Sequence, residues 1–127
     1  MSIKKYILIF ILFSTYLVSA DTFDDVALAI KKSSTKEISK YFNSTVELTI
    51  LENEGVYSKS QAEVILKNFL TQNPPINISI NHRGSSAQGA KYAIAVYDCQ
   101  KCKYRVYIFM KESPSGMMIQ ELRFEKE

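Results

Sequence analysis

The chain has 127 residues, of which 46% are hydrophobic, 23% are charged and 12% are aromatic. The formal net charge of +3 includes Lys4 and Lys5, so without these two lysines the charge of residues 21–127 falls to +1. No basic stripe of the kind that binds nucleic acid is present, and we exclude that class of partner. A chain of this length has room for one hydrophobic core.

Residues 1–20 have the pattern of a secretory signal peptide. Two lysines near the start are followed by an apolar run over 6–18 and by the small-x-small exit at 18–20. The run is shorter than the ~20 residues that cross a bilayer. We therefore expect a cleaved signal, no stable membrane span afterwards, and one domain over 21–127 that is periplasmic or secreted. An uncleaved membrane anchor is the alternative.

Three helices are predicted in the first half of that domain. The first runs from an N-cap at Thr22 to about Lys32. Ser34-x-x-Glu37 and Ser58-x-x-Gln61 are typical capping boxes, which begin a short second helix and a longer third helix. Asn73-Pro74-Pro75 ends the third helix, because proline cannot continue one.

The periodicity then changes to two, which is typical of strands. A first strand is predicted over 46–50, with a short partner at Val56-Tyr57. Four further strands are predicted over 76–83, 91–98, 103–111 and 117–126. Helices followed by a run of antiparallel strands indicate an α+β domain with the helices packed on one face of the sheet.

The two faces of the predicted 91–98 and 103–111 hairpin differ in character. With a two-residue loop, one face is uncharged and is expected to meet the helices; it carries Ala93, Ala95, Tyr97, Tyr104, Val106, Ile108 and Met110. The other face is both aromatic and charged, as is typical of a surface that contacts a partner. Its candidate interface residues, with a homodimer as one expectation, are Tyr92, Arg105, Tyr107 and Phe109.

Six segments carry a resemblance to a known family: 44–49, 54–63, 84–86, 91–94, 104–107 and 119–125. Together with the order of elements, they resemble an uncharacterised family of small exported bacterial proteins with the nuclear-transport-factor-like, or cystatin-like, cone fold. The resemblance implies a cone-shaped, curved antiparallel sheet packed against about three N-terminal and central helices. It implies no established activity and no catalytic residues. Cys99-Gln100-Lys101-Cys102 departs from the polar turn expected in that family.

Cys99-x-x-Cys102 is the sharpest local motif. After export, a pair of cysteines favours a disulfide, and a two-residue turn brings the Cα atoms near the ~5.5 Å that a bridge requires. Free thiols and thiol–disulfide activity are alternatives, although a reactive thiolate in such a motif usually lies at a helix N-terminus. A zinc site lacks further ligands, since His82 is the only histidine, and we predict neither metal nor cofactor.

His82 shares one side of its predicted strand with three isoleucines, so we expect it to face the helices. In a cone pocket it is a candidate acid or base near neutral pH. The other pocket candidates are Gln120, Tyr97 and Tyr104. The ordinary interpretation is a histidine at the edge of the core and tyrosines that fill volume.

The leading functional hypothesis is an exported, non-catalytic binding module. It binds either a small apolar ligand in the cone or a protein partner on the aromatic face. The alternatives are a small pocket enzyme, of the isomerase or hydratase kind, that uses His82, and a thiol–disulfide protein that uses Cys99 and Cys102. The sequence contains no nucleophile elbow, phosphate-binding glycine loop or His-Glu metal motif.

Overall fold

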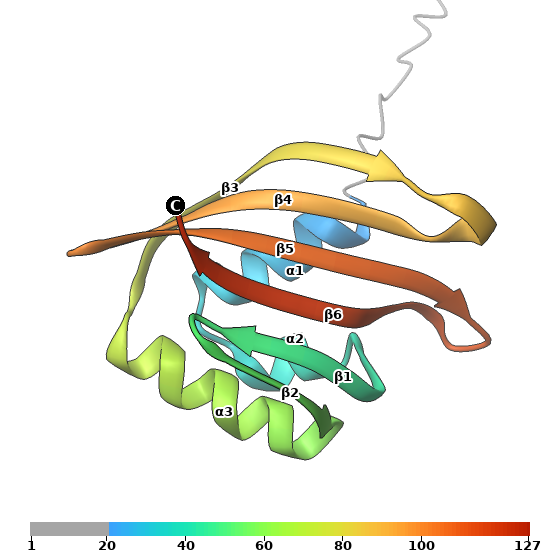
Figure 1. The fold of residues 1–127 in the computed structure, drawn as a ribbon, viewed down its shortest axis with the longest axis horizontal. Coiled ribbons are helices and arrows are strands. Elements are labelled where there is room, and N and C mark those ends of the chain that lie inside the picture. Colours follow the sequence, from blue (N-terminus) through green and yellow to red (C-terminus); the bar gives the residue numbers. More distant parts are fainter. Residues whose placement is uncertain (1–20) are drawn as a thin grey trace, which may run out of the picture.

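The computed structural model describes residues 21–127, and the predicted signal peptide at 1–20 lies outside the described residues. Three α-helices lie on one side of a six-stranded sheet (Figure 1). In chain order the elements are α1 (Thr22–Lys31), α2 (Thr35–Ser39), β1 (Phe42–Ile50), β2 (Asn53–Ser58), α3 (Lys59–Gln72), β3 (Pro75–Ser85), a 3₁₀ turn (Ala87–Gly89), β4 (Lys91–Cys99), β5 (Cys102–Ser113) and β6 (Gly116–Lys126). None of the helices in this range is long and apolar enough to cross a membrane.

Side-chain caps fix where the helices begin. Ser58 and Gln61 form the capping box predicted for α3, and the Ser34 hydroxyl caps α2 by accepting a hydrogen bond from the Glu37 N–H. The prediction for α1 is wrong by one residue, because Asp21 rather than Thr22 is the N-cap. The Asp21 carboxylate accepts a hydrogen bond from the Asp24 N–H, and the Asp24 carboxylate accepts one from the Asp21 N–H.

The strand order is β2-β1-β6-β5-β4-β3. Neighbouring strands are antiparallel except β1 and β6, which run parallel, so the sheet is mixed and the prediction of a wholly antiparallel sheet is wrong at this pair. β1 begins at Phe42, four residues before the predicted start of the strand. The predicted α+β class, with a curved sheet packed against three helices, is confirmed.

The predicted β4–β5 hairpin is confirmed in both loop length and register. Cys99 pairs with Cys102, and Tyr97 pairs with Tyr104. The uncharged side of the hairpin faces the helices and is buried apart from Tyr104, which is half-buried. It forms one core with the apolar sides of α1 and α3, including Val26, Leu66 and Phe69.

A β-bulge in β3 overturns the predicted orientation of His82. Ile80 pairs with Ala95, whereas His82 pairs with Ile94, so Asn81 is an extra residue in the strand. Ile94 and Ala95 point to opposite sides of the sheet. His82 therefore lies on the side away from the helices and is exposed, which makes the prediction that it faces the helices wrong. The same bulge turns Arg83 toward α1.

We call the side of the sheet away from the helices the open face. Among the described residues, no helix lies over it (Figure 1). Its central residues on β3 to β6 are His82, Gly84, Tyr92, Ile94, Val96, Lys103, Arg105, Tyr107, Phe109, Glu121, Arg123 and Glu125. The four predicted interface residues thus lie together on this face.

Candidate functional site

The four predicted pocket residues do not converge on one cavity. The exposed His82 ring places Nε2 3.2 Å from the Tyr92 hydroxyl on the open face. Gln120 is an extra residue in β6, at a second bulge opposite Phe109 and Met110. Its Oε1 accepts a hydrogen bond of 3.2 Å from Asn43 Nδ2. Only Tyr97 and Tyr104 face the helices.

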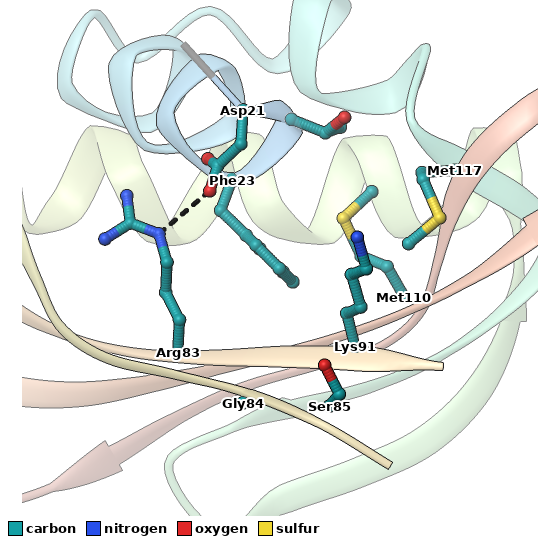
Figure 2. A pocket seen from close by; sticks show the side chains of 9 residues that line it. Asp21, Phe23, Arg83, Gly84, Ser85, Lys91, Met110 and Met117 are labelled. Atoms are coloured by element: carbon teal, nitrogen blue, oxygen red, sulfur yellow. Dashed lines mark hydrogen bonds and ion pairs between the residues drawn. The ribbon is translucent and has the colours of Figure 1, made fainter. Parts of the chain in front are cut away.

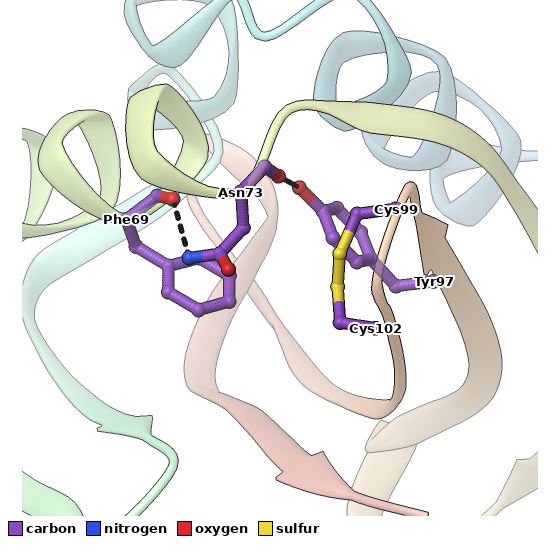
Figure 3. Close-up of a disulfide and its surroundings, with 5 residues drawn as sticks. All are labelled: Phe69, Asn73, Tyr97, Cys99 and Cys102. Carbon is purple, nitrogen blue, oxygen red and sulfur yellow. Dashed lines mark hydrogen bonds between the residues drawn. A yellow bond between two sulfur atoms is a disulfide. The ribbon is translucent and has the colours of Figure 1, made fainter.

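Tyr97 is fully buried at the end of the sheet where the β4–β5 hairpin turns. Its hydroxyl donates a hydrogen bond to the carbonyl of Asn73, the C-cap of α3, and Asn73 Nδ2 donates to the Phe69 carbonyl at 3.1 Å (Figure 3). Burial, with a smaller contribution from Tyr104, raises the pKa of Tyr97 far above its ordinary value. A neutral, buried phenol bound to a backbone carbonyl fills volume and holds the end of α3.

Cys99 and Cys102 lie beside this tyrosine and form a disulfide (Figure 3). Their Cα atoms are 5.0 Å apart, within the range that a bridge accepts. Both residues are half-buried and pack against the core. The pair closes the hairpin at the end of the sheet that Tyr97 fills, and we call this region the closed end.

Aromatic rings run across the open face. The Tyr92 and Tyr107 rings stack at a centroid distance of 6.1 Å, and Tyr107 stacks with Phe109 at 6.5 Å. The Arg123 guanidinium lies 4.7 Å from the Tyr107 ring centroid, a cation–π distance. Arg123 Nε is buried and lies 3.1 Å from a Glu121 carboxylate oxygen, without hydrogen-bond geometry, so this contact is an ion pair only.

Charged groups on the open face are partly withdrawn from water. Burial raises the pKa of Glu121, and the nearby carboxylates Glu47, Glu54 and Glu125 raise it further, whereas Arg123 opposes the shift. Burial and the charge of Glu121 also raise the pKa of the Tyr107 hydroxyl. The aromatic rings and arginines of this face are residue types enriched at protein interfaces, whereas Glu121 and Glu125, which lie beside them on β6, belong to a type that is depleted there.

Gly84 has a specific role on this face. A Cβ atom at this position would overlap the Tyr92 ring, which lies over the glycine. The ring is also within hydrogen-bonding reach of His82. The glycine therefore allows Tyr92 to lie flat along the neighbouring strand, in line with the other rings.

A pocket of about 280 Å³ opens at the opposite end of the helix-facing side (Figure 2). We call it the end pocket. It lies between the start of α1, the β3–β4 hairpin and the β5–β6 hairpin, and its lining residues are Asp21, Thr22, Phe23, Arg83, Gly84, Ser85, Lys91, Met110 and Met117. Sequence reasoning did not identify this site, because its residues come from five separate elements.

An ion-pair cluster forms one wall of the end pocket. Arg83 Nε lies 2.9 Å from an Asp21 carboxylate oxygen, and its Nη2 lies 2.5 Å from an Asp24 oxygen. Burial alone would raise the pKa of Asp21, but the Asp24 N–H and the Arg83 charge outweigh it and hold the pKa below its ordinary value. The β3 bulge makes this cluster by turning Arg83 toward α1.

Comparisons with known proteins identify a family whose function is not assigned. The family described as "Domain of unknown function (DUF4783)" matches residues 23–125. The structure is similar to a DUF4783 family protein from Bacteroides ovatus, with 25% identity, a TM-score of 0.75, and coverage of 80% of this chain and 92% of that chain. A family protein from Bacteroides uniformis gives 21% identity and a TM-score of 0.78, with 84% of this chain and 98% of that chain covered.

A more distant structure agrees on the fold. A domain of unknown function from Nostoc punctiforme, described as having a cystatin-like fold, is 9% identical, with a TM-score of 0.65 over 85% of this chain and 80% of that chain. No match was found among curated proteins. The expectation of an uncharacterised family with a cystatin-like fold is confirmed.

Proposed function

Because the chain belongs to the DUF4783 family, a family of unknown function from which no activity can be carried over, we propose a function from its surfaces. The protein is an exported, non-catalytic binding module, and its binding surface is the open face of the sheet. The partner to which the proposal commits is a second copy of the chain.

The aromatic rings of the open face support this proposal most directly. Tyr92, Tyr107 and Phe109 stack in sequence, with Arg105 and Arg123 on the same face. Tyrosine and arginine dominate the residues that contribute most to binding at protein interfaces. Burying these rings against a protein partner would therefore contribute favourably to the free energy of binding.

The size of the face also suits a dimer. The four strands β3 to β6 lie ~4.8 Å apart and have ladders of roughly nine residues at ~3.3 Å each, which gives a face on the order of 500 Å². Two such faces packed against each other would bury about 1,000 Å², the lower limit for a specific interface.

The competing uses of the fold have less support. The helix-facing side near Tyr97 is filled by Phe69 and Phe124, with ring centroids 6.1 Å and 5.6 Å from Tyr97, so a ligand at that end would have to displace the core. The proposed enzyme relied on His82 in the interior, and His82 is on the open face.

Self-association tests the binding surface. We expect sedimentation velocity to show a concentration-dependent dimer, with a dissociation constant raised at least ~10-fold by Arg105→Glu or Tyr107→Glu, the loss typical of an interface hot spot. Arg105 is exposed, so its variant retains the fold even if the Tyr107 variant does not. The control matched to Tyr107→Glu is Val64→Glu on α3, where a 57% exposed residue gains the same single negative charge on the helix side of the molecule.

Two results would overturn the proposal. One is a monomer at millimolar concentration, and the other is an equal loss of dimer in Val64→Glu. Export is tested separately, by fractionating bacteria that express the full chain. We expect the protein outside the cytoplasm with Asp21 as its first residue, and an intact N-terminus in the cytoplasm would refute export.

A further inference from the structure

The end pocket exists because the helices do not cover the whole sheet. α1 begins beside Arg83, near the end of β3, while β3 and β4 continue to Ser85 and Lys91 beyond it. The helix-facing side of these last residues therefore borders the pocket instead of a helix (Figure 2). The end pocket and the central residues of the open face have only Gly84 in common, and binding in the pocket does not require the proposed dimer.

One wall of the pocket carries a positive charge that the described residues do not neutralise. Among residues 21–127, Lys91 has no ion-pair partner, and the Ser85 hydroxyl has no hydrogen-bond partner. Ser85 and Lys91 are paired across the β3–β4 ladder, so they are adjacent on the same side of the sheet. Together they present an ammonium group and a hydroxyl to the same space.

The acids beside the pocket share one counter-charge. Asp21 and Asp24 both contact the Arg83 guanidinium, and both lie at the N-terminus of α1, whose dipole favours negative charge. Two carboxylates and one guanidinium keep a formal charge of −1, of which the dipole offsets about half. Lys91, on the other wall, is the charge available to a ligand.

The floor of the pocket is apolar. Phe23 and Met110 are buried, and Met117 is half-buried and reaches the pocket from the β5–β6 hairpin. Methionine side chains are flexible and polarizable, so they adapt to hydrocarbon ligands of different shape. The pocket thus combines an apolar floor with a cationic, hydrogen-bonding wall.

We propose that the end pocket binds a small monocarboxylate with a short hydrocarbon tail. The Lys91 ammonium and the Ser85 hydroxyl hold the carboxylate, and the tail lies on Phe23, Met110 and Met117. The volume of about 280 Å³ lies near the lower end of the roughly 300–1,000 Å³ of ordinary ligand pockets, which suits a small ligand. Hexanoate, with eight heavy atoms, is the probe.

The class of ligand is tested by titrating the full chain with matched probes. Binding is measured from the change in the amide chemical shifts during each titration. We expect hexanoate to bind saturably, with shifts at the β3–β4 and β5–β6 hairpins. Hexanol lacks the charge and acetate lacks the tail, so each should bind at least ~10-fold more weakly, the loss expected when a charge-assisted hydrogen bond or a buried chain is removed. Hexylamine, whose charge is reversed, should not bind at this site.

The role of Lys91 is tested by Lys91→Met, which keeps the apolar stem and removes the ammonium group. Hexanoate affinity should fall ~10-fold, the value of one charge-assisted contact, while hexanol affinity stays unchanged. Lys67→Met on α3 changes an exposed lysine away from both the end pocket and the open face, so it is the matched control and should bind hexanoate like the unmodified chain. The proposal fails if hexanoate does not saturate, if its shifts map to the open face, if hexanol or hexylamine binds as well, or if Lys91→Met has no effect. None of these results depends on whether the chain dimerises.

Discussion

The closed end and the end pocket lie on the same side of the same sheet, yet one is core and the other is cavity. At the closed end, Tyr97 and Phe69 fill the space between α3 and the sheet, and the Cys99–Cys102 disulfide closes the hairpin. At the other end, Lys91 occupies a helix-facing position and borders a pocket. β4 and β5 keep the same alternation at both ends, so on these two strands the difference comes from what covers them.

Element lengths explain the difference. The ten residues of α1 span about 15 Å and the fourteen of α3 about 21 Å, at 1.5 Å per residue. The twelve residues of β5 span roughly 40 Å at ~3.3 Å per residue. No single helix covers such a strand along its whole length. Where the strands extend beyond the helices, polar side chains on the helix-facing side remain in contact with water.

The largest expected effect is the loss of packing at the closed end. Tyr97→Ala removes a fully buried ring and should lower the free energy of unfolding by ~3–5 kcal/mol, the usual cost of truncating a buried aromatic side chain. Met117→Ala at the end pocket removes a half-buried side chain and should cost about 1 kcal/mol. Urea unfolding followed by circular dichroism measures both, and equal losses would contradict the contrast between the two ends.

The disulfide should have a smaller effect. Replacing both Cys99 and Cys102 by Ser releases a loop of four residues, for which the chain-entropy estimate is about 2 kcal/mol. Reduction of the unmodified protein should produce the same shift in the urea midpoint, and reductant should not affect the double variant. Self-association should be unchanged, because the pair does not lie on the open face. A change in dimerisation without a change in stability would show that the pair has a binding role.

The Tyr97 hydroxyl should account for part of the effect of the ring. Tyr97→Phe keeps the packing and leaves the Asn73 carbonyl without its donor, which should cost about 1 kcal/mol. Tyr104→Phe is the matched control, since the structure gives the Tyr104 hydroxyl no hydrogen bond among the described residues, and it should change stability by less than ~0.5 kcal/mol. Equal effects in the two variants would mean that the bond to Asn73 does not stabilise α3.

The closed end could be predicted from the sequence almost completely. Strict alternation over β4 and β5, joined by a two-residue loop, determines which side chains share a face, and this is why the pairing of Tyr97 with Tyr104 was correct. Capping boxes and the Asn73-Pro74-Pro75 stop gave both ends of α3. These are local rules, and they hold where the backbone is regular.

The end pocket could not be predicted because it depends on an irregular backbone. The bulge at Asn81 reverses the alternation of β3, so His82 moves to the open face and Arg83 turns to α1. A second bulge at Gln120 turns that residue away from the interior as well. Neither bulge has a glycine that would mark it in the sequence. Arg83 and Asp21 are 62 residues apart, and only the folded sheet brings them together.

The smallest expected effect is that of the ion pairs at the end pocket. Arg83→Met should cost at most ~1 kcal/mol at pH 7, because the side chains of Arg83 and Asp21 are 43% and 47% exposed and the solvent screens their attraction. The pKa of Asp21 is lower in the folded state than the ordinary value of 3.8, so the folded state holds fewer protons on this group than the unfolded state. The stabilisation is therefore complete above pH 3.8 and is lost as the pH falls through the lower, folded-state pKa.

The difference in urea midpoint between Arg83→Met and the unmodified chain should shrink as the pH falls through that interval, and also at high salt. Arg105→Met, which removes an arginine without an ion pair among the described residues, should show no such dependence. A difference that persists in acid would assign the contribution of Arg83 to the packing of its aliphatic stem against the wall of the pocket, and not to its charge.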